Sequence, residues 1–453
     1  MEVNSCKLPF RCFYRLTFNI GDKKFREEEK RFMVLGKYSF GIGDRFCHQG
    51  KAQLAALIKA KQQGIAITPV WNKSNREHTI IGTKQADTRK EAYDAVVASG
   101  WSEPYFVDAD HIGLSNVDRF VDSSDFFTLD VADFIAKTAE KTDVESFVRK
   151  YKKYVGQLSI DSIDETLNIT EKQIEVIAGK FLLAVRQSGK IYHHVAEAKG
   201  MDNFVTEVSM DETDMPQTPV EMLFILAAIA DEGIPIQTIA PRFSGRFNKG
   251  VDYVGDVASF AKEFERDLAV IAFAVKEFGL PENIKLSIHS GSDKFSIYKP
   301  IAAALKKFDA GLHIKTAGTT WLEELIGLAM AGGDGLEIAK EIYAKALPKF
   351  DELCGPYATV IDIDKTKLPS ADGVAKWDGQ KFAAALRHDQ SCGQYNPNFR
   401  QLLHVGYKIA AQLGTRYTEA LQKHETTIAQ NVTENIYERH IKPIFSPDGS
   451  QPA

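Results

Sequence analysis

The feature that most constrains the fold of this 453-residue chain is a short buried strand that runs into a polar loop. Residues 285–289 alternate in polarity and end at His289, and the loop Ser-Gly-Ser-Asp-Lys follows at once. Similar runs end at His313 and at His111. In an α/β barrel the strand fixes the backbone, and the loop at its carboxyl end presents side chains to a ligand. The sequence therefore predicts parallel strands that carry chemistry at their carboxyl ends.

Strand-like runs alternate with amphipathic helical stretches along the chain, a pattern typical of α/β proteins with a parallel sheet. We expect strands to end near residues 39–45, at 64–70, before Asp108, at 203–207, at 236–240, at His289 and at His313, with a closing strand at 358–362 or just before 387–389. This gives eight strands. The predicted fold class is α/β, a (β/α)8 TIM-like barrel.

Two regions exceed a minimal barrel. Residues 1–35 are expected to form an N-terminal extension, and residues 127–200 a long helical insertion after the third strand. The insertion acts either as a lid or as an enlarged helical layer, and the sequence leaves both open. We expect one catalytic domain over residues 36–445 and a C-terminal tail over 446–453.

Composition excludes several classes of protein. The net charge is −5, and the basic residues at 23–31 are interleaved with glutamates, so no nucleic-acid partner is expected. The five cysteines form no CxxC pair, which fits a reducing compartment. No signal peptide is recognisable, and no apolar run approaches the roughly 20 residues needed to span a bilayer. We expect a cytoplasmic protein without membrane association; whether it forms a homo-oligomer stays open.

Three histidines at strand ends indicate a metal site. His111, His289 and His313 each follow or end a strand, and Glu207 ends the fourth expected strand, where it offers an oxygen ligand. Mixed nitrogen and oxygen ligation favours Zn²⁺ and also suits Mn²⁺, Co²⁺ or Ni²⁺. Taken singly, each residue has an ordinary alternative, such as a polar turn or a salt bridge. The sequence predicts a divalent metal ion as cofactor.

Acid–base chemistry is expected beside these ligands. Asp110 precedes His111, so its carboxylate is placed to carry a proton for a metal-bound substrate. Lys315 follows His313 by two positions and shares its side of the strand, and Asp293 is a second candidate for proton transfer. The alternative is that Asp110 caps a helix. We predict Asp110, Lys315 and Asp293 as catalytic residues.

An acidic substrate is indicated by cations near the strand ends. The loop 240–250 carries two arginines and a lysine, and guanidinium groups match carboxylates in shape. The start of a helix near Gly318 also suits an anion. A solvated basic loop and an ordinary capped helix are the alternatives. The predicted substrate-binding residues are Arg242, Arg246, Lys294, Thr319 and Thr320.

Four strings resemble one known family. Residues 107–113, 240–253, 289–295 and 313–321 are similar to the tagaturonate epimerase family, and the resemblance runs over about residues 35–445. It implies a metal-dependent isomerase that interconverts D-tagaturonate and D-fructuronate, so the expected partner is a small-molecule keto sugar acid. Asp110-His111 with residues 289–292 is also similar to class II aldolases, in which an aspartate precedes a zinc-binding histidine.

The chemistry implied by this resemblance explains the aldolase-like residues. The two sugar acids differ at a hydroxyl carbon β to the ketone, where the C–H bond is not acidified. A retro-aldol route instead breaks a carbon–carbon bond, lets the aldehyde turn, and re-forms the bond. It requires a Lewis acid, a proton shuttle and cations that hold the carboxylated fragment. The four predicted ligands, Asp110 and the basic residues, Lys315 included, fit these roles.

Two other functions remain open from the sequence. A metal-dependent class II-like aldolase or sugar isomerase that acts on a keto sugar acid would use the same residues. A non-catalytic sugar-acid binding protein would keep the cations but would not need three histidines at strand ends. An epimerase that oxidises its substrate transiently would need a nicotinamide, and the glycine fingerprint for its phosphates is missing.

Overall fold

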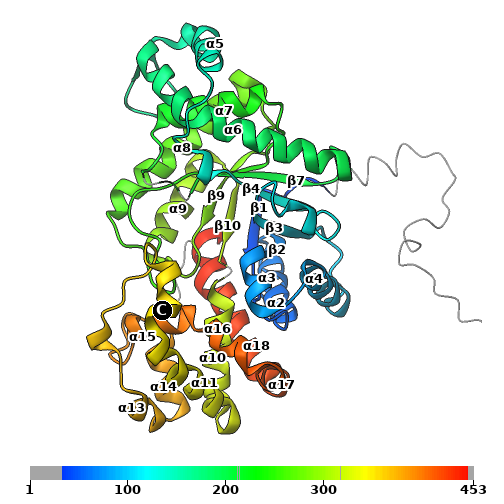
Figure 1. Ribbon diagram of the computed structural model, residues 1–453, viewed down its shortest axis with the longest axis vertical. Helices are drawn as coiled ribbons and strands as arrows, with labels where there is room; N and C mark the ends of the chain where they lie inside the picture. The colour runs from blue at the N-terminus through cyan, green and yellow to red at the C-terminus, as the bar shows by residue number, and fades with distance from the viewer. Residues whose placement is uncertain (1–32, 212, 214, 317, 447–453) are drawn as a thin grey trace, which may run out of the picture.

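Eight parallel strands form a closed barrel in the computed structural model, which describes residues 33–211, 213, 215–316 and 318–446 (Figure 1). In order around the barrel they are β1 (Tyr38–Ile42), β10 (Leu312–Lys315), β9 (Lys285–His289), β8 (Thr238–Ala240), β7 (Val205–Ser209), β4 (Phe126–Asp130), β3 (Phe106–Ile112) and β2 (Thr68–Ser74). β1 pairs with both β2 and β10, which closes the sheet. The predicted (β/α)8 barrel is confirmed.

Helices between the strands cover the outside of the barrel. They are α2 (Gly50–Gln62), α3 (Asn75–Ile81), α4 (Gln85–Ser99), the short η1 (Val117–Arg119), α6 (Glu171–Lys199), α7 (Pro219–Asp231), α8 (Val257–Phe278) and α9 (Phe295–Phe308). The last three elements of the chain, α18 (Glu425–Glu434), η7 (Asn435–Ile441) and α19 (Lys442–Phe445), pack against α2 and α9. The C-terminus therefore supplies the helix that covers the closing seam.

The strand count differs from the sequence prediction in one place. The fourth strand is β4, which lies at the start of the segment expected to be helical, so the insertion follows the fourth strand and not the third. Residues 358–362 and 387–389 form no strand, and β10 closes the barrel by pairing with β1. The predicted closing strand was wrong. Residues 360–361 have β-prone side chains, Val and Ile, but they pack among the helices that follow β10, and this tertiary packing overrides their β propensity.

The insertion enlarges the helical layer. It contains α5 (Lys141–Tyr151), the 3-10 turn η3 (Lys152–Tyr154) and a hairpin of β5 (Gly156–Leu158) and β6 (Leu167–Ile169). Tyr151 donates to Asp231 at the end of α7 (2.8 Å), and Tyr154 donates to Glu277 near the end of α8 (2.6 Å). Helices of a barrel run opposite to its strands, so these contacts lie away from the carboxyl ends of the strands. These contacts make the insertion an added layer that packs on the helices α7 and α8.

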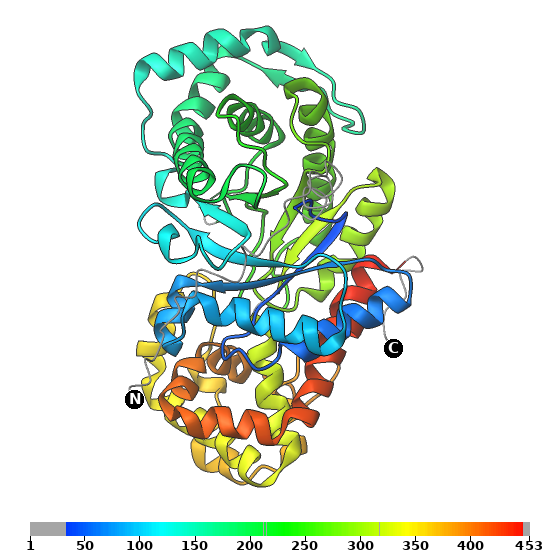
Figure 2. The ribbon, with the colours of Figure 1, turned by 90° about the vertical axis from the view of Figure 1, so that its right-hand side faces the viewer.

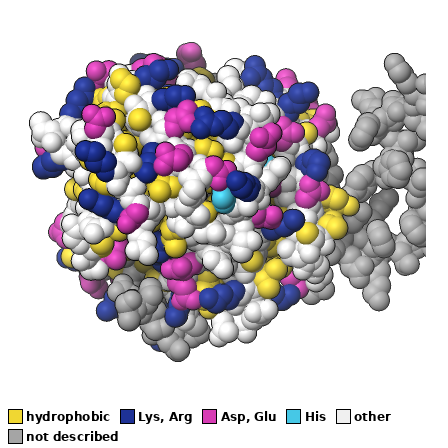
Figure 3. Space-filling view, turned by 90° about the horizontal axis from the view of Figure 1, so that it is seen from below, with side chains coloured by type: hydrophobic (Ala, Val, Ile, Leu, Met, Phe, Trp, Pro, Cys, Tyr) yellow, Lys and Arg dark blue, Asp and Glu magenta, His cyan; other side chains and the backbone are white. Residues whose placement is uncertain are grey.

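The chain after β10 builds a second helical half below the barrel in the view of Figure 1, and Figure 2 shows the two halves on either side of the strands. Its helices are α10 (Gly318–Ala331), α11 (Gly333–Ala346), α12 (Phe350–Cys354), α13 (Ala371–Ala375), α14 (Gly379–Leu386), α15 (Pro397–Val405), α16 (Tyr407–Leu413) and α17 (Thr415–Lys423). On the face that Figure 3 shows, basic and acidic side chains are interleaved. Among the described helices, none is long and apolar enough to cross a membrane.

The expected extension and tail, 1–35 and 446–453, lie outside the described residues except for 33–35 and 446. Leu35 belongs to a small apolar cluster near the amino ends of the strands, with Val70, Phe106, Phe126 and Val205. Strand pairing places Ser39, His313 and Ser287 in one row and Gly41, Lys315 and His289 in the row two residues above it. The interior therefore changes from apolar near the amino ends of the strands to polar at their carboxyl ends.

Lys285 lies at the lower end of β9 and donates from Nζ to the carbonyls of Leu35 (3.2 Å) and Gly36 (2.6 Å). Burial lowers the pKa of Lys285 to about 7. In the unfolded chain a lysine titrates near pKa ~10.4, so between these values the unfolded state binds more protons and stability rises with pH. Below about pH 7 the ammonium is present in both states and its burial cost is largest.

The quantity to follow is the free energy of unfolding of the wild type minus that of Lys285→Met. We expect this difference to increase from pH 7 to pH 10, by up to about 1.4 kcal/mol per pH unit. Urea unfolding of both proteins across this range measures the difference. Lys306→Met, which changes an exposed lysine on α9, serves as the control and should show a flat difference. A flat difference for Lys285→Met would contradict the prediction.

Candidate active site

A buried ammonium surrounded by carboxylates marks the carboxyl ends of the strands. Lys315 Nζ lies 2.8 Å from Asp108, 3.1 Å from Asp110 and 2.9 Å from Glu207, and it donates to Thr128 Oγ1 at 2.5 Å. These residues come from β10, β3, β7 and β4. Strand pairing sets Asp108 and Glu207 on either side of β4, so the barrel closure itself brings the three carboxylates to one lysine.

Charge and burial oppose each other in this cluster. Burial alone would lower the pKa of Lys315, but the nearby carboxylates outweigh it and hold that pKa well above its ordinary value. Burial raises the pKa of Asp108 to about 7 even though Lys315 opposes the shift. Burial also acts to raise the pKa of Glu207, yet Lys315 and His289 bring it well below its ordinary value. Lys315 is thus charged, and Glu207 is held as a carboxylate.

A bulge in β3 turns His111 into the site. The register of β3 against β4 shifts between Ala109 and Ile112, and His111 has φ 55°, in the left-handed region that non-glycine residues rarely adopt. Simple alternation would face Asp110 inward and His111 outward; the bulge lets both reach the barrel mouth, with His111 Nδ1 3.0 Å from Asp110 Oδ1. Strain of about 1–3 kcal/mol is typical of such a residue at a functional site.

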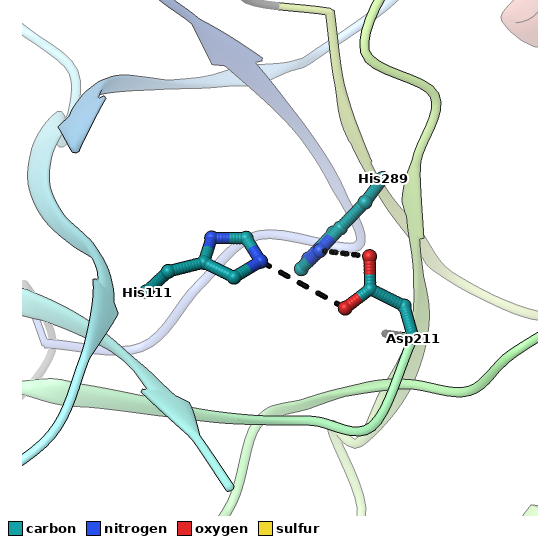
Figure 4. Close-up of side chains that lie close together, drawn as sticks. All are labelled: His111, Asp211 and His289. Atoms are coloured by element: carbon teal, nitrogen blue, oxygen red, sulfur yellow. Dashed lines mark hydrogen bonds and ion pairs between the residues drawn. The ribbon is translucent and has the colours of Figure 1, made fainter. Parts of the chain in front are cut away.

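His111, His289 and Asp211 form a candidate metal centre (Figure 4). One ligand atom from each lies within 4.8 Å of the others, and the three side chains point toward one another from β3, β9 and the segment after β7. His289 Nδ1 is 3.1 Å from Asp211, and His111 Nε2 is 3.7 Å from it. Two imidazoles and a carboxylate are a donor set that suits divalent transition metals.

The donor set and the local charge both fit a cation. Asp108, Asp110 and Glu207 surround the single ammonium of Lys315, and Asp211 adds a fourth carboxylate 3.1 Å from His289 Nδ1. Glu207 Oε1 lies 2.8 Å from His289 Nε2. A carboxylate on one imidazole nitrogen orients the ring and directs the other nitrogen to a metal. Glu207, predicted as a ligand, is therefore placed where it would orient His289.

His313, the fourth predicted ligand, lies outside this group. Its side chain points into the barrel one row below Lys315, where Nδ1 lies 2.9 Å from Ser39 Oγ and the ring packs 5.3 Å from that of Phe126. Burial lowers the pKa of His313 to about 3, so the ring is neutral. The structure brings together His111, His289 and Glu207 of the predicted ligands but not His313.

Asp293 is the hub of a separate buried network. It lies 2.8 Å from Arg400 Nη2, 3.1 Å from His388 Nδ1 and 3.2 Å from His440 Nε2, and Thr319 Oγ1 donates to it at 3.3 Å. Its carboxylate is fully buried. These contacts join the loop after β9 to the C-terminal helices. Asp293 and Thr319, predicted as catalytic and substrate-binding, thus hold the loop that begins at His289.

The other predicted substrate residues do not converge on one point. Lys294 Nζ donates to the Val251 carbonyl, Ser292 Oγ and the Asp293 carbonyl, and Thr320 Oγ1 accepts from Gln53. Arg246 is exposed and faces Asp362 at 3.3 Å. Arg242 is the predicted cation beside the candidate metal centre: its Nη1 lies 3.4 Å from the carbonyl oxygen of Asp211.

Asp211 was not predicted, although the sequence carries a signal for it. Glu207, Ser209 and Asp211 alternate along and beyond β7, so they share one face, and Ser209 Oγ donates to Asp211 at 2.6 Å. The polar residues of this face mark the mouth of the barrel, as those of β3 do. Carboxylates, imidazoles and a lysine at the carboxyl ends of barrel strands define the active site of a (β/α)8 enzyme.

Comparisons with known proteins agree with this class. The model of the tagaturonate epimerase family matches residues 22–444. The tagaturonate/fructuronate epimerase of Thermotoga maritima is 31% identical over 419 residues, which cover 89% of this chain and 80% of that protein. The chain therefore belongs to the tagaturonate epimerase family, and it is an isomerase of the epimerase type.

Solved structures show the same fold. The glycerol-complexed fructuronate-tagaturonate epimerase UxaE from Cohnella laeviribosi matches with a TM-score of 0.73 at 23% identity, over 91% of this chain and 83% of that one. The native crystal structure of the same enzyme matches with a TM-score of 0.72 at 22% identity over the same shares. The barrel with its added helical halves is thus the fold of these epimerases.

Proposed function

We propose that this enzyme interconverts D-tagaturonate and D-fructuronate by inverting the hydroxyl carbon β to the ketone, through a retro-aldol and aldol route. The membership of the family supports the substrates, and the cluster around Lys315 supports the chemistry. The observation that carries the proposal is the convergence of Asp110, Lys315 and the two histidines at one barrel mouth. An aldolase or sugar isomerase would use the same groups but would release or rearrange different products.

The proposed cofactor is a divalent metal ion held by His111, Asp211 and His289, with Zn²⁺ favoured by the donor set. Such an ion would supply a Lewis acid for the ketone of the substrate. Glu207 orients His289, and Thr238 Oγ1 donates to Glu207 at 2.7 Å and holds it in place. The ligands are thus supported from behind by a buried hydrogen-bond chain.

Asp110 is the proposed proton shuttle. The side chain of Asp110 is 14% exposed, whereas those of Asp108 and Glu207 are fully buried, so Asp110 is the carboxylate of the three that a substrate hydroxyl can reach. It would take the proton from the β hydroxyl as the carbon–carbon bond breaks and return it when the bond re-forms. Lys315, 3.1 Å from Asp110, stabilises the charged form of this carboxylate before the transfer.

The function and the bond that breaks are tested together by NMR of the products in D₂O. We expect purified, metal-replete enzyme to convert tagaturonate to fructuronate with no deuterium at the inverted carbon, because its C–H bond survives a retro-aldol step. Deuterium at that carbon would exclude the retro-aldol route. Accumulating three-carbon products without epimer would identify an aldolase.

The metal centre is tested by elemental analysis of purified variants. His111→Ala, His289→Ala and Asp211→Ala should each weaken metal binding at least about tenfold, since each removes one ligand. His313→Ala is the matched control, because it removes a histidine one row deeper, and it should retain the metal. If His313→Ala loses the metal and Asp211→Ala keeps it, the metal site lies deeper in the barrel, at His313.

Asp110→Asn separates proton transfer from ligation. The amide keeps the shape of the carboxylate but does not accept a proton, so turnover should fall by roughly two to four orders of magnitude while the metal content is unchanged. Steady-state kinetics and elemental analysis on the same preparation measure both. Asp118→Asn, which alters an exposed carboxylate, should leave both unaffected. Near-normal turnover of Asp110→Asn would assign the shuttle elsewhere.

A further inference from the structure

A cluster of basic side chains lies next to the loop that follows His289, outside the cluster around Lys315. Two tyrosines lie among these side chains, with the Tyr357 and Tyr407 hydroxyls 3.1 Å apart. Cations surround their rings: to the ring centroid, Arg45 Cζ lies 4.4 Å from Tyr407, and Arg76 Cζ (5.0 Å), Lys408 Nζ (5.3 Å) and Lys249 Nζ (5.8 Å) lie near Tyr357. We call Arg45, Lys249 and His404, with these rings, the basic cluster.

One cation of this cluster, Lys249, lacks a matching carboxylate in the described part of the chain. Arg45 Nε is paired with Glu77 at 3.1 Å, but within the described residues no carboxylate oxygen lies within 4.0 Å of Lys249 Nζ. Burial lowers the pKa of Lys249, and Arg76 and Arg45 add to this effect. Positive groups crowded into a half-buried space repel one another, and an anion bound between them would relieve the repulsion.

Two buried nitrogen atoms of this cluster have no partner among the described residues. His404 on α15 is 2% exposed, and its Nε2 has no hydrogen-bond partner among the described residues. Arg45 Nη1 is likewise buried and unpartnered in that part of the chain. Arg45 and Lys249 are the charges that act most strongly on His404. Buried polar atoms without partners are rare in proteins, and a ligand is one way to satisfy them.

Glycines let the basic cluster approach the start of α10. A Cβ at Gly318 would lie 2.5 Å from His404 Nε2 and 2.2 Å from the Gly291 carbonyl oxygen, so only glycine permits the approach. A Cβ at Gly291 would lie 3.9 Å from Lys249 Nζ. The amino terminus of a 14-residue helix, which favours anions, thus meets an unpartnered imidazole and a lysine.

The basic cluster is connected to the candidate active site through two short stretches of chain. Gly291 follows His289 by two residues, and Gly318 follows Lys315 by three, so the Cα atoms are separated by at most about 7 and 11 Å. A keto sugar acid carries its ketone near one end and its carboxylate at the other. The ketone end would lie at His289 and Lys315, and the carboxylate end at the basic cluster.

We propose that the basic cluster binds the carboxylate of the substrate, with Lys249 and His404 as its donors. This proposal rests on the proposed function. It assigns carboxylate binding to residues other than Arg246, which faces Asp362, and Lys294, which donates to the Val251 carbonyl. During a retro-aldol step the carboxylated fragment stays anchored there while its aldehyde group turns. The nearest rival for the carboxylate is Arg242, beside Asp211.

The first test compares a charged substrate with a neutral one. Lys249→Met should lower kcat/KM for tagaturonate about 10- to 100-fold and leave kcat/KM for tagatose, which has no carboxylate, within about twofold. Lys249→Arg should recover part of the loss. Lys306→Met is the exposed-lysine control and should change neither value. Equal losses on both substrates, or loss of discrimination in Arg242→Met but not in Lys249→Met, would overturn the proposal.

The second test does not depend on turnover. By titration calorimetry, glycerate should bind wild-type enzyme more tightly than glycerol, and Lys249→Met and His404→Gln should remove that difference; thermal unfolding verifies that both variants are folded. If glycerate binding depends on Lys249 but tagaturonate is not epimerised, the proposed function fails and the carboxylate site stands. Epimerisation with no dependence on Lys249 overturns the site alone. If glycerol 3-phosphate binds more tightly than glycerate, and this binding depends on Lys249, the basic cluster is a phosphate site and the carboxylate assignment is overturned.

Discussion

The ammonium of Lys315 is the interaction on which the rest of the site depends. The barrel closure places Asp108, Asp110 and Glu207 around one point, and two like charges 4 Å apart repel by about 4 kcal/mol at an effective dielectric of 20. A central cation converts this repulsion into attraction. It keeps Asp110 charged at the mouth and Glu207 charged behind His289. The same lysine therefore prepares the carboxylate proposed to move a proton and the carboxylate that orients a candidate ligand.

The barrel could be predicted because residues that carry chemistry interrupt apolar strands at their carboxyl ends. His289, His313 and Asp108 each gave such a contrast. β4 gave a weaker one: Phe126–Asp130 is a short run that ends in a single aspartate and enters a long helical segment, and Thr128, on the same face as Asp130, looks like any strand threonine. Its place became visible only through its pairing with β3 and β7. Residues 358–362 had the opposite property, a β-prone composition in a helical surrounding.

Depth within the barrel was the part of the site that the sequence could not provide. His313 and Lys315 share a side of β10, but two residues along a strand differ by about 6.6 Å, so only one of them reaches the mouth. The reverse holds for His111, which a bulge brings in. Asp293 depends on contacts with Arg400 and His440, more than 100 residues away in the sequence. Such contacts are set by tertiary packing and leave no local pattern.

The two ends of the proposed site differ in charge, although the chain as a whole is acidic at −5. Carboxylates surround Lys315 at one end, and cations with unpartnered donors surround Tyr357 at the other. A ligand with a carboxylate at one end is repelled by the first and attracted by the second, so the field favours one orientation. The contact between Gly291 and Gly318 fixes the two ends relative to each other, because the loop after β9 and the helix after β10 meet there without side chains between them. In the proposed site, the orientation of the substrate is therefore set by the segments that follow the two strands carrying His289 and Lys315.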